Sequence, residues 1–229
     1  ENVTTENDFG YDWLPKLDDG QNASWLLLFD EMSKGKFSGF ICLGMNPACS
    51  SPNAGKTRKG LANLDWMVNM DIFESETSSF WKGPGMNPRE IKTEVFLLPA
   101  ASSVEKEGSV TNSGRVLQWR YKAQEPLGET KADGQIIHEI FTGLKNLYIT
   151  EGGVFPHPLL KLKWDYARDG KIDFQEVARE VNGYFLEDID QHPVDKKAYK
   201  KGSLVPSFVY LLADGRTSSG NWIHSGSYT

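Results

Sequence analysis

The sequence predicts an α/β fold, in which a Rossmann-like parallel sheet with helices on both faces is followed by a mixed, partly helical C-terminal appendage. Two observations lead to this prediction. Between residues 37 and 147, short apolar runs alternate with segments of helical periodicity, as in parallel strands joined by crossover helices. Beyond Thr150 the sequence becomes aromatic and is interrupted by prolines, so the second part is expected to be less regular.

Three parts are expected along the chain. Residues 1–36 form a polar lead-in with a first helix over 24–33, residues 37–147 form the Rossmann-like layer, and residues 148–229 form the mixed helical appendage with a final strand. The sequence begins at Glu1 and ends at Thr229 without a strand or helix to finish it. We interpret both ends as cuts from a longer protein.

The predicted strands of the layer all end at loops or polar residues. The first, over 37–43, runs into a loop rich in Gly, Pro, Ser and Asn. Ligands of parallel sheets sit outside the carboxyl ends of the strands, so the loops at Gly44, Asp71 and Pro99 are expected to share one rim. The remaining predicted elements are strands over 66–70, 94–98 and 205–212 and helices over 56–64, 75–81 (with Ser75 as N-cap), 132–147 and 174–185.

Composition limits the classes of function. The formal net charge is -6 and the basic residues are scattered, so nucleic acid is not expected as a partner. The early apolar stretch Trp25 to Phe29 is too short to cross a bilayer, and no leader precedes it, so direct membrane insertion is not expected. Cys42 and Cys49 are the two cysteines. They form no C-x-x-C, so this chain alone is not expected to bind an iron–sulfur cluster or structural zinc.

A phosphate-binding loop is one alternative interpretation. Gly55-Lys56-Thr57 follows a predicted strand and opens a predicted helix, where such a loop ends in G-K-[ST]. The first glycine of that motif is missing, because Ser50 stands five residues before Gly55. No second strand ends in the aliphatic run and Asp that would hold magnesium. A P-loop-like nucleotide-binding protein is therefore a rival interpretation.

A calcium-binding module over Asp165 to Glu176 is a second alternative. Its Asp, Asp, Gly, Ile, Asp and Glu occupy loop positions one, five, six, eight, nine and twelve of a calcium-binding hand. Position three is Ala167, so one carboxylate is absent, and Pro156 and Pro158 interrupt the incoming helix. A solvated turn between helices is the competing interpretation. The four histidines suggest no nucleophile, base and acid trio.

Three segments together are more specific than these motifs. They are ICLGMNPACSS at 41–51, LDWMVNMDIFESETSSFW at 64–81, and VFLLPAASSVEKEGSVTNSGRVLQW at 95–119. Their order and spacing resemble the molybdopterin-guanine-dinucleotide oxidoreductases, the family of formate dehydrogenases, nitrate reductases and dimethyl sulfoxide reductases. L-D-W-M-V, the N-G-Y of Asn182 to Tyr184 and DGRTSSGNWIHSG near the end are most similar to membrane-associated or periplasmic formate dehydrogenases. The similarity covers nearly the whole chain.

The resemblance implies an internal piece of the large (alpha, catalytic) subunit of a molybdenum or tungsten formate dehydrogenase. Such a piece would bind one of two molybdopterin guanine dinucleotides and support two-electron oxidation of formate to carbon dioxide. A nitrate reductase-type relative of the same family is an alternative. The sequence leaves open whether the metal is molybdenum or tungsten.

The physical requirements of a guanine nucleotide agree with this resemblance. Guanine needs a carboxylate that accepts from its N1 and N2 hydrogens, and the diphosphate needs a loop free of bulk. Asp71, at a strand end, suits the guanine. Candidate cofactor contacts in the two loops, in addition to Asp71, are Gly44, Asn46, Pro47, Glu74, Ser75 and Thr77.

The segment after Leu-Pro supplies three further candidate cofactor residues, Glu105, Asn112 and Arg115. They match the family's pattern together with Gly108 and Thr111. An arginine there is suited to pair with phosphate or to anchor the loop to a carboxylate. A loop held by its own hydrogen bonds is an equally open interpretation for each.

The resemblance also places the redox chemistry outside this chain. In the family the metal is ligated by a selenocysteine or cysteine followed by histidine, whereas Cys49 is followed by Ser50. The [4Fe-4S] cluster is expected elsewhere in the full subunit, and the isolated chain is expected to be inert. Expected partners are the rest of the same large subunit and an iron–sulfur electron-transfer subunit, and the parent enzyme is expected to be periplasmic.

Overall fold

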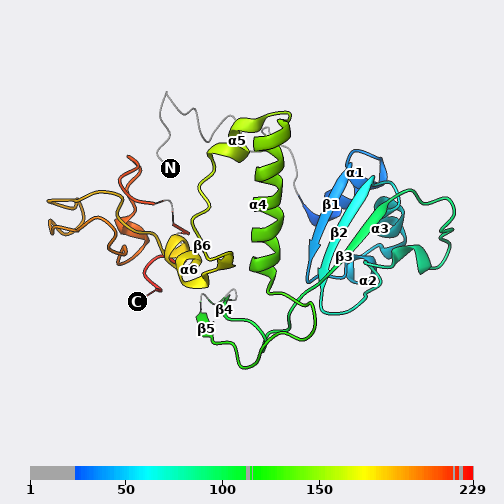
Figure 1. Cartoon of the computed structure of the whole chain (residues 1–229), viewed down its shortest axis with the longest axis horizontal. Coiled ribbons are helices and arrows are strands. Elements are labelled where there is room, and N and C mark those ends of the chain that lie inside the picture. The colour runs from blue at the N-terminus through cyan, green and yellow to red at the C-terminus, as the bar shows by residue number, and fades with distance from the viewer. Residues whose placement is uncertain (1–23, 112–113, 115, 219, 222–223, 229) are drawn as a thin grey trace. The chain divides into compact units, whose positions relative to one another are not determined.

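The computed structural model describes residues 24–111, 114, 116–218, 220–221 and 224–228. The described residues form two compact units (Figure 1). One contains residues 24–105 and 124–136, and the other contains 106–123, apart from the gaps just given, and the chain from 137 onward. The predicted α/β fold class is confirmed, because the first unit is built on a parallel sheet with helices.

The sheet of the first unit has three parallel strands in the order β1 (Gly39–Leu43), β2 (Trp66–Asp71) and β3 (Glu94–Pro99). Each strand overlaps a predicted one, with bounds that differ by one or two residues. In the register, Cys42 of β1 lies beside Asn69 of β2, which lies beside Leu97 of β3. The carboxyl ends of the three strands therefore reach the same edge.

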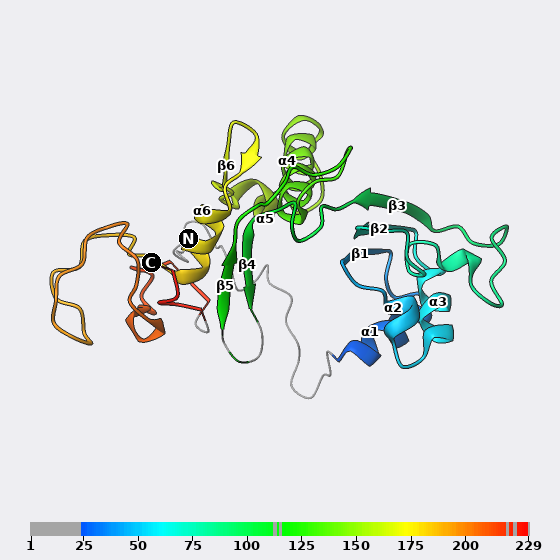
Figure 2. The same cartoon turned by 90° about the horizontal axis from the view of Figure 1, so that it is seen from below.

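Helices cover one face of this sheet. Figure 2 shows α1 (Trp25–Ser33), α2 (Pro47–Ser50) and α3 (Ala54–Leu61) together on one side of it. The side chain of Ser24 caps α1 by accepting from the amide of Leu27, which satisfies one of the free donors of the first turn. The buried core between helices and sheet consists of Phe29, Met32, Ala48, Leu61, Leu64, Met67 and Phe80.

The predicted helix over 75–81 is wrong. The hydroxyls of Ser78 and Ser79 both donate to the backbone carbonyl of Ser75, and the amide of Ser75 donates back to the Ser78 hydroxyl at 2.8 Å. Serine side chains that bond to nearby backbone compete with helix formation. The segment therefore forms turns that lead into a short 3-10 helix, η1 (Phe80–Lys82).

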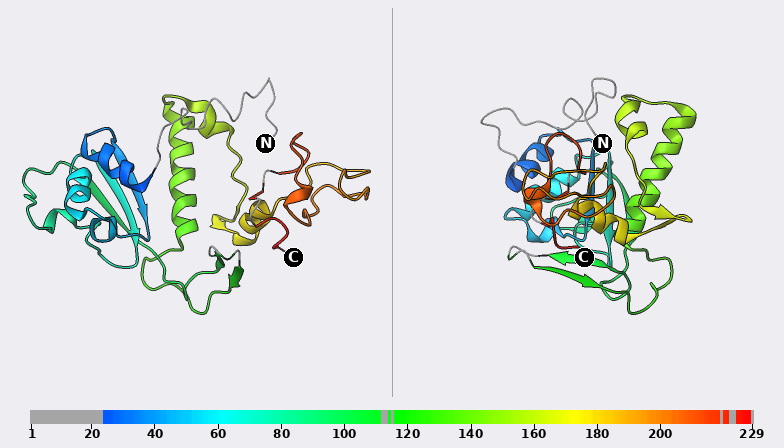
Figure 3. Two further views of the ribbon diagram at one scale, coloured as in Figure 1. Left: turned by 180° about the vertical axis from the view of Figure 1, so that it is seen from behind. Right: turned by 90° about the vertical axis from the view of Figure 1, so that its left-hand side faces the viewer.

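The second unit is mixed, with helices, small hairpins and long loops. The long helix α4 (Asp133–Glu151) begins in the first unit and is followed by α5 (Pro156–Lys161), as Figure 3 shows. The helix α6 (Phe174–Asn182) ends three residues before its predicted end, because Gly183 adopts a φ of 90°. The sequence interpretation missed two small hairpins, β4 (Gly108–Thr111) with β5 (Leu117–Arg120) and β6 (Ala167–Arg168) with β7 (Lys171–Ile172). Among the described residues, no helix is long and apolar enough to cross a membrane.

The predicted final strand over 205–212 is also wrong. This run contains a 3-10 helix, η2 (Phe208–Tyr210). Tyr210, Leu211 and Leu212 pack on a small core of Phe185, Ile189 and Val205, whereas Phe208 and Val209 are exposed. The amide of Leu212 donates to the Thr217 hydroxyl at 2.9 Å, where a strand would use a neighbouring backbone. The apolar character of the run reflects the packing of part of it against this core, not the pairing of its backbone in a sheet.

Candidate cofactor-binding site

The carboxyl edge of the sheet brings the predicted loops together. The amide of Gly44, after β1, donates to the carbonyl of Met70 in β2 at 2.9 Å, and the amide of Ala100, after β3, donates to the carbonyl of Asp71 at 3.0 Å. These bonds extend the parallel ladder by one residue beyond β1 and β3. Gly44, Asp71 and Pro99 thus lie on one rim, as the sequence predicts.

Gly44 leaves open space beside the rim. Its φ of 56° lies in the left-handed region, which glycine adopts without the strain that a Cβ brings. A Cβ built at this position would meet no heavy atom within 4 Å. The backbone of the first loop is therefore bare on this side.

Asn46 joins the first loop to the second. Its side-chain oxygen accepts from the amide of Thr77 at 3.1 Å and from the hydroxyl of Thr77 at 2.9 Å. The same hydroxyl accepts from the amide of Ala48 at 2.9 Å. Thr77 is fully buried. Asn46 and Thr77, both predicted site residues, therefore hold the two loops together. We call this set of hydrogen bonds the bracket, and the side-chain oxygen of Asn46 is fully used in it.

Glu76 completes the bracket and was missed by the sequence interpretation. The side-chain nitrogen of Asn46 donates to its carboxylate at 2.5 Å. This hydrogen bond is the main reason that the pKa of Glu76 lies below its usual range. The only signal in the sequence was its place directly before Thr77, in the segment that carries the resemblance.

Asp71 presents a carboxylate at the centre of the rim. One of its oxygens accepts from the amide of Ile72 at 2.8 Å. The other has no hydrogen-bond or ion-pair partner within the described part of the chain. The carboxylate lies close enough to Cys42 for its charge to raise the pKa of that thiol, although burial is the larger cause. Asp71 can therefore accept hydrogen bonds from a ligand.

The other residues predicted in these loops have varied surroundings. Pro47 is buried at the first position of α2. Glu74 is exposed and pairs with Lys82, whose hydrogen bond holds the pKa of Glu74 below its usual range. The hydroxyl of Ser75 is buried and has no hydrogen-bond partner among the described residues. Glu74 therefore lies in an ordinary surface ion pair, whereas the hydroxyl of Ser75 is shielded from solvent.

The third predicted segment contributes a structural carboxylate. Glu105 is buried and accepts from the amide of Ser102 at 2.8 Å. This hydrogen bond is the largest cause of a pKa below the usual range. Gln124 also donates to it at 3.5 Å, so Glu105 ties the loop after β3 to a later one. Asn112 and Arg115 lie outside the described residues.

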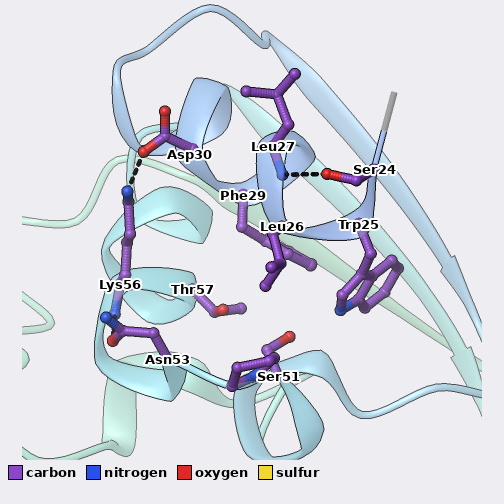
Figure 4. A pocket seen from close by; sticks show the side chains of 11 residues that line it. Ser24, Trp25, Leu26, Leu27, Phe29, Asp30, Ser51, Asn53, Lys56 and Thr57 are labelled. Carbon is purple, nitrogen blue, oxygen red and sulfur yellow. Dashed lines mark hydrogen bonds and ion pairs between the residues drawn. The ribbon is translucent and has the colours of Figure 1, made fainter. Parts of the chain in front are cut away.

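The residues of the possible phosphate-binding loop are not arranged as a loop. Gly55, Lys56 and Thr57 lie inside α3, and the amine of Lys56 is paired with Asp30 of α1. Lys56 and Thr57 line a cavity of about 450 Å³ between the start of α1 and the start of α3, which Figure 4 shows. Its remaining wall is largely apolar, with Trp25 and Phe29. The lysine is thus engaged in helix packing.

Two carboxylates of the possible calcium loop are engaged in contacts within the chain. Asp173 caps α6 by accepting from the amide of Gln175 at 2.9 Å. Glu176 pairs with Arg168 at 2.9 Å and with Arg179. Within the described parts of the chain, no three His, Cys, Asp or Glu side chains gather as a possible metal site. The segment contains the β6–β7 hairpin, whose strands are joined by a tight turn.

Comparisons with known proteins identify the relatives of this chain. No family model matches it. The formate dehydrogenase subunit alpha of Megalodesulfovibrio gigas is 48% identical over 96% of the chain. The alpha subunit of formate dehydrogenase 2 (cytochrome c-553) of Nitratidesulfovibrio vulgaris is 46% identical over 99%, and the nitrate-inducible formate dehydrogenase major subunit of Escherichia coli is 43% identical over 98%.

The chain is a homologue of part of the formate dehydrogenase alpha subunit. It spans about 22% of the length of these relatives, and the predicted resemblance is confirmed. An assimilatory nitrate reductase catalytic subunit of Bacillus subtilis is similar over a shorter range, at 32% identity over 51% of the chain. The formate dehydrogenase similarity covers both compact units, whereas the nitrate reductase similarity covers half of the chain.

Proposed function

We propose that this chain is the part of a formate dehydrogenase alpha subunit that holds the nucleotide end of a molybdopterin guanine dinucleotide. One observation supports this most. At the rim, the exposed backbone of Gly44 lies next to the carboxylate of Asp71, which can accept hydrogen bonds. Gly44 leaves open space beside the first loop, and Asp71 keeps an unpartnered oxygen beside it. These are the groups that a diphosphate and a guanine require.

The donor set of the rim fits such a cofactor. Guanine presents N–H groups, which the free carboxylate oxygen of Asp71 would accept. The bracket of Asn46, Glu76 and Thr77 orients the loops on which these groups stand. When bound, the cofactor would supply the molybdenum or tungsten centre that takes two electrons from formate as it becomes carbon dioxide. The chain itself would bind and orient the nucleotide.

The wider assembly follows from the same proposal. Metal ligand and [4Fe-4S] cluster would belong to the rest of the same large subunit, because the free cysteines of this chain are a buried Cys42 and an exposed Cys49 in the nucleotide loop. Electrons would leave through an iron–sulfur subunit, and the parent enzyme would be periplasmic. Within this family we favour formate over nitrate as the substrate, since the formate dehydrogenase relatives match nearly the whole chain.

Asp71→Asn in the full-length alpha subunit tests the proposal. The amide keeps the size of the side chain but replaces one acceptor oxygen with a donor, which faces the N–H groups of guanine. We expect the purified subunit to carry several-fold less guanine nucleotide, measured after acid release, and to show correspondingly less formate oxidation. The melting temperature of the cofactor-free subunit should be unchanged.

Glu90→Gln is the matched control. Glu90 is exposed and accepts a hydrogen bond from the side chain of Asn87, away from the rim residues, so its replacement should leave the nucleotide content unchanged. A wild-type nucleotide content in the Asp71→Asn subunit would contradict the proposal, because it would mean that a group other than Asp71 recognises the guanine. The isolated chain, with cofactor added, should not oxidise formate, and measurable turnover by it would contradict the assignment of the redox chemistry to the rest of the subunit.

A further inference from the structure

A loop in the second unit, residues 189–199, is closed at its base and strained at its tip. At the base, Ile189 and Tyr199 form an antiparallel bridge, in which each amide donates to the other carbonyl at 2.8 Å. Further along, the amide of His192 donates to the carbonyl of Lys197 at 2.9 Å. Lys196 adopts a left-handed φ of 62°, which persists in a residue other than glycine only where surrounding contacts impose it. The tip therefore depends on the contacts that hold it.

The side chain of His192 joins the tip of this loop to the chain around η2. It is fully buried. Its Nδ1 atom accepts from the amide of Val194 at 3.2 Å, and its Nε2 atom lies 3.1 Å from the carbonyl oxygen of Tyr210. A backbone amide only donates and a carbonyl only accepts. The imidazole is therefore neutral, with its hydrogen on Nε2, because no other form makes both bonds.

Aromatic rings enclose this imidazole. The ring centroids of Tyr210, Tyr199 and Phe185 lie 4.8, 5.7 and 5.8 Å from that of His192. A charge among these rings is removed from water, which is costly without a paired group. A proton added to Nδ1 would also turn that atom into a donor that faces the amide of Val194, so the bond to the tip would be lost. The closed loop therefore requires the neutral imidazole.

The other ionisable groups around the loop respond to acid in a different pH range. Burial would raise the pKa of Asp195, but hydrogen bonds from the amide of Lys197 and the hydroxyls of Tyr199 and Tyr210 outweigh it and hold that pKa below its usual range. Burial, followed by the bond to Asp195, raises the pKa of Tyr199. Carboxylates, lysines and arginines ordinarily titrate outside the range of about pH 5–8, in which histidine changes charge. Those on the surrounding segments are Glu187, Asp188, Asp190, Lys196, Lys197, Lys200, Lys201, Asp214 and Arg216.

We propose that His192 is an acid-sensitive latch, which in its neutral form fastens the 189–199 loop to the chain around η2 and on protonation of Nδ1 releases it. The proton comes from solvent, and the open loop lets water hydrate the imidazolium. Opening is local, because the contacts that fail are those of Val194 and Tyr210 with one side chain. The parallel sheet of the first unit stays folded. This inference is independent of the cofactor.

Hydrogen exchange of this chain tests the proposal. Peptides that cover the 189–199 loop and β2 are followed by mass spectrometry at about pH 7.5 and about pH 5, on either side of the range in which histidine titrates. Each rate is corrected for the intrinsic exchange rate at that pH. We expect the amides of Val194, Lys196 and Tyr199 to lose protection at least tenfold at the lower pH. The protection of β2 should be the same at both.

Two histidine substitutions identify the group that responds. Glutamine at position 192 can accept from the amide of Val194 and donate to the carbonyl of Tyr210, but it does not titrate. His192→Gln should therefore keep the loop protected equally at both pH values. His157→Gln is the matched control, because His157 is exposed in α5. Its loop should open in acid as in the wild type.

The ring of His192 can also be observed directly in the wild-type chain, in case glutamine fails to close the loop. Nitrogen chemical shifts of the imidazole, measured by NMR, should report hydrogen on Nε2 alone at about pH 7.5. Its protonation and the loss of loop protection should share one midpoint, and separate midpoints would overturn the proposal. So would a loop that stays protected at about pH 5, an equal loss of protection in His192→Gln, or a simultaneous loss in β2.

Discussion

The side-chain oxygen of Asn46 accepts two hydrogen bonds from Thr77, one from its backbone amide and one from its hydroxyl. The two residues stand 31 positions apart in the sequence and follow neighbouring strands of a parallel sheet. Because Thr77 is fully buried, neither donor can turn to water instead. The contact makes the geometry of the rim depend on a single side chain.

Asn46→Ala is therefore expected to destabilise the chain. It leaves the amide of Thr77 unpaired in a buried place and removes the acceptor of its hydroxyl, and a buried donor left unsatisfied costs about 1–3 kcal/mol. We expect a loss of roughly 2–4 kcal/mol in the free energy of unfolding, measured by urea denaturation. Ser50→Ala removes an exposed hydroxyl that donates to the backbone of Asn46 and should change it by less than about 0.5 kcal/mol. Equal losses of unfolding free energy in the two variants would contradict a stabilising role of the Asn46–Thr77 hydrogen bonds.

Gly39 of β1 is required because the indole of Trp66 lies against it. A Cβ at residue 39 would come within 2.1 Å of the ring, so Gly39→Ala must push Trp66 away from the sheet. Overpacking of this kind costs about 1–3 kcal/mol of stability. Urea denaturation of the single variants and of Gly39→Ala with Trp66→Val measures the coupling, and the alanine should cost much less once the indole is gone.

Gly143→Ala is the control, because here the same substitution should raise the free energy of unfolding instead of lowering it. Gly143 lies inside α4, and a Cβ there would meet no atom within 4 Å. Alanine in a helix interior should stabilise the chain by about 0.5–1 kcal/mol relative to glycine. Destabilisation by both glycine substitutions to a similar extent would argue against a specific clash at Gly39.

The strands were predictable because their signal is local. The apolar runs of β1, β2 and β3 are bounded by polar loops, and the rule that parallel strands end at one edge was enough to place Gly44 beside Asp71. The run over 205–212 misled the same reasoning, because Tyr210 and Leu211 pack on a core made by loops. An apolar run shows that side chains are buried and does not show that the backbone pairs.

The roles of individual site residues were less predictable. Asn46 and Thr77 were both selected as cofactor contacts, yet they bond to each other. Glu105 likewise bonds to its own loop. Which partner a polar side chain takes depends on the orientation of loops that are distant in sequence, and that orientation has no period or spacing to detect. Asp71 is the predicted residue whose carboxylate the structure leaves most available.

Asn182, the first residue of the motif N-G-Y, is expected to anchor the end of the described chain. Its side-chain nitrogen donates to the carbonyls of Gly183 and Val205, and its oxygen accepts from the amides of Gly226 and Tyr228 at 2.7 and 3.1 Å. Asn182→Leu removes all four bonds, so we expect the amides of residues 226 and 228 to lose protection in hydrogen exchange, by tenfold or more.

Asn182→Asp separates the two halves of this anchor. A carboxylate still accepts from both amides but cannot donate to the two carbonyls, so protection of residues 226 and 228 should largely remain while global stability falls. An aspartate variant that exposes these amides as much as the leucine variant would show that the anchor depends on the donor side.

Cys42 and Cys49 are expected to differ sharply in reactivity. Cys49 is exposed, whereas Cys42 is buried, and burial raises the pKa of the Cys42 thiol to about 11. The thiolate is the form that reacts with alkylating agents. Iodoacetamide at pH 8 should therefore modify Cys49 and leave Cys42 intact in the native chain, as read by mass spectrometry. In urea both should be modified.

The same shift in pKa predicts how stability depends on pH. Folding raises the pKa of Cys42 from about 9 to about 11, so the folded chain holds this proton where the unfolded chain has released it. The contribution of Cys42 is then fully present below about pH 9 and is lost as the pH rises toward 11. Comparison with Cys42→Ala isolates it, because the other titrating groups are shared. The difference in melting temperature between wild type and Cys42→Ala should shrink from pH 8 to pH 11, and a constant difference would show that the thiol ionises equally in both states.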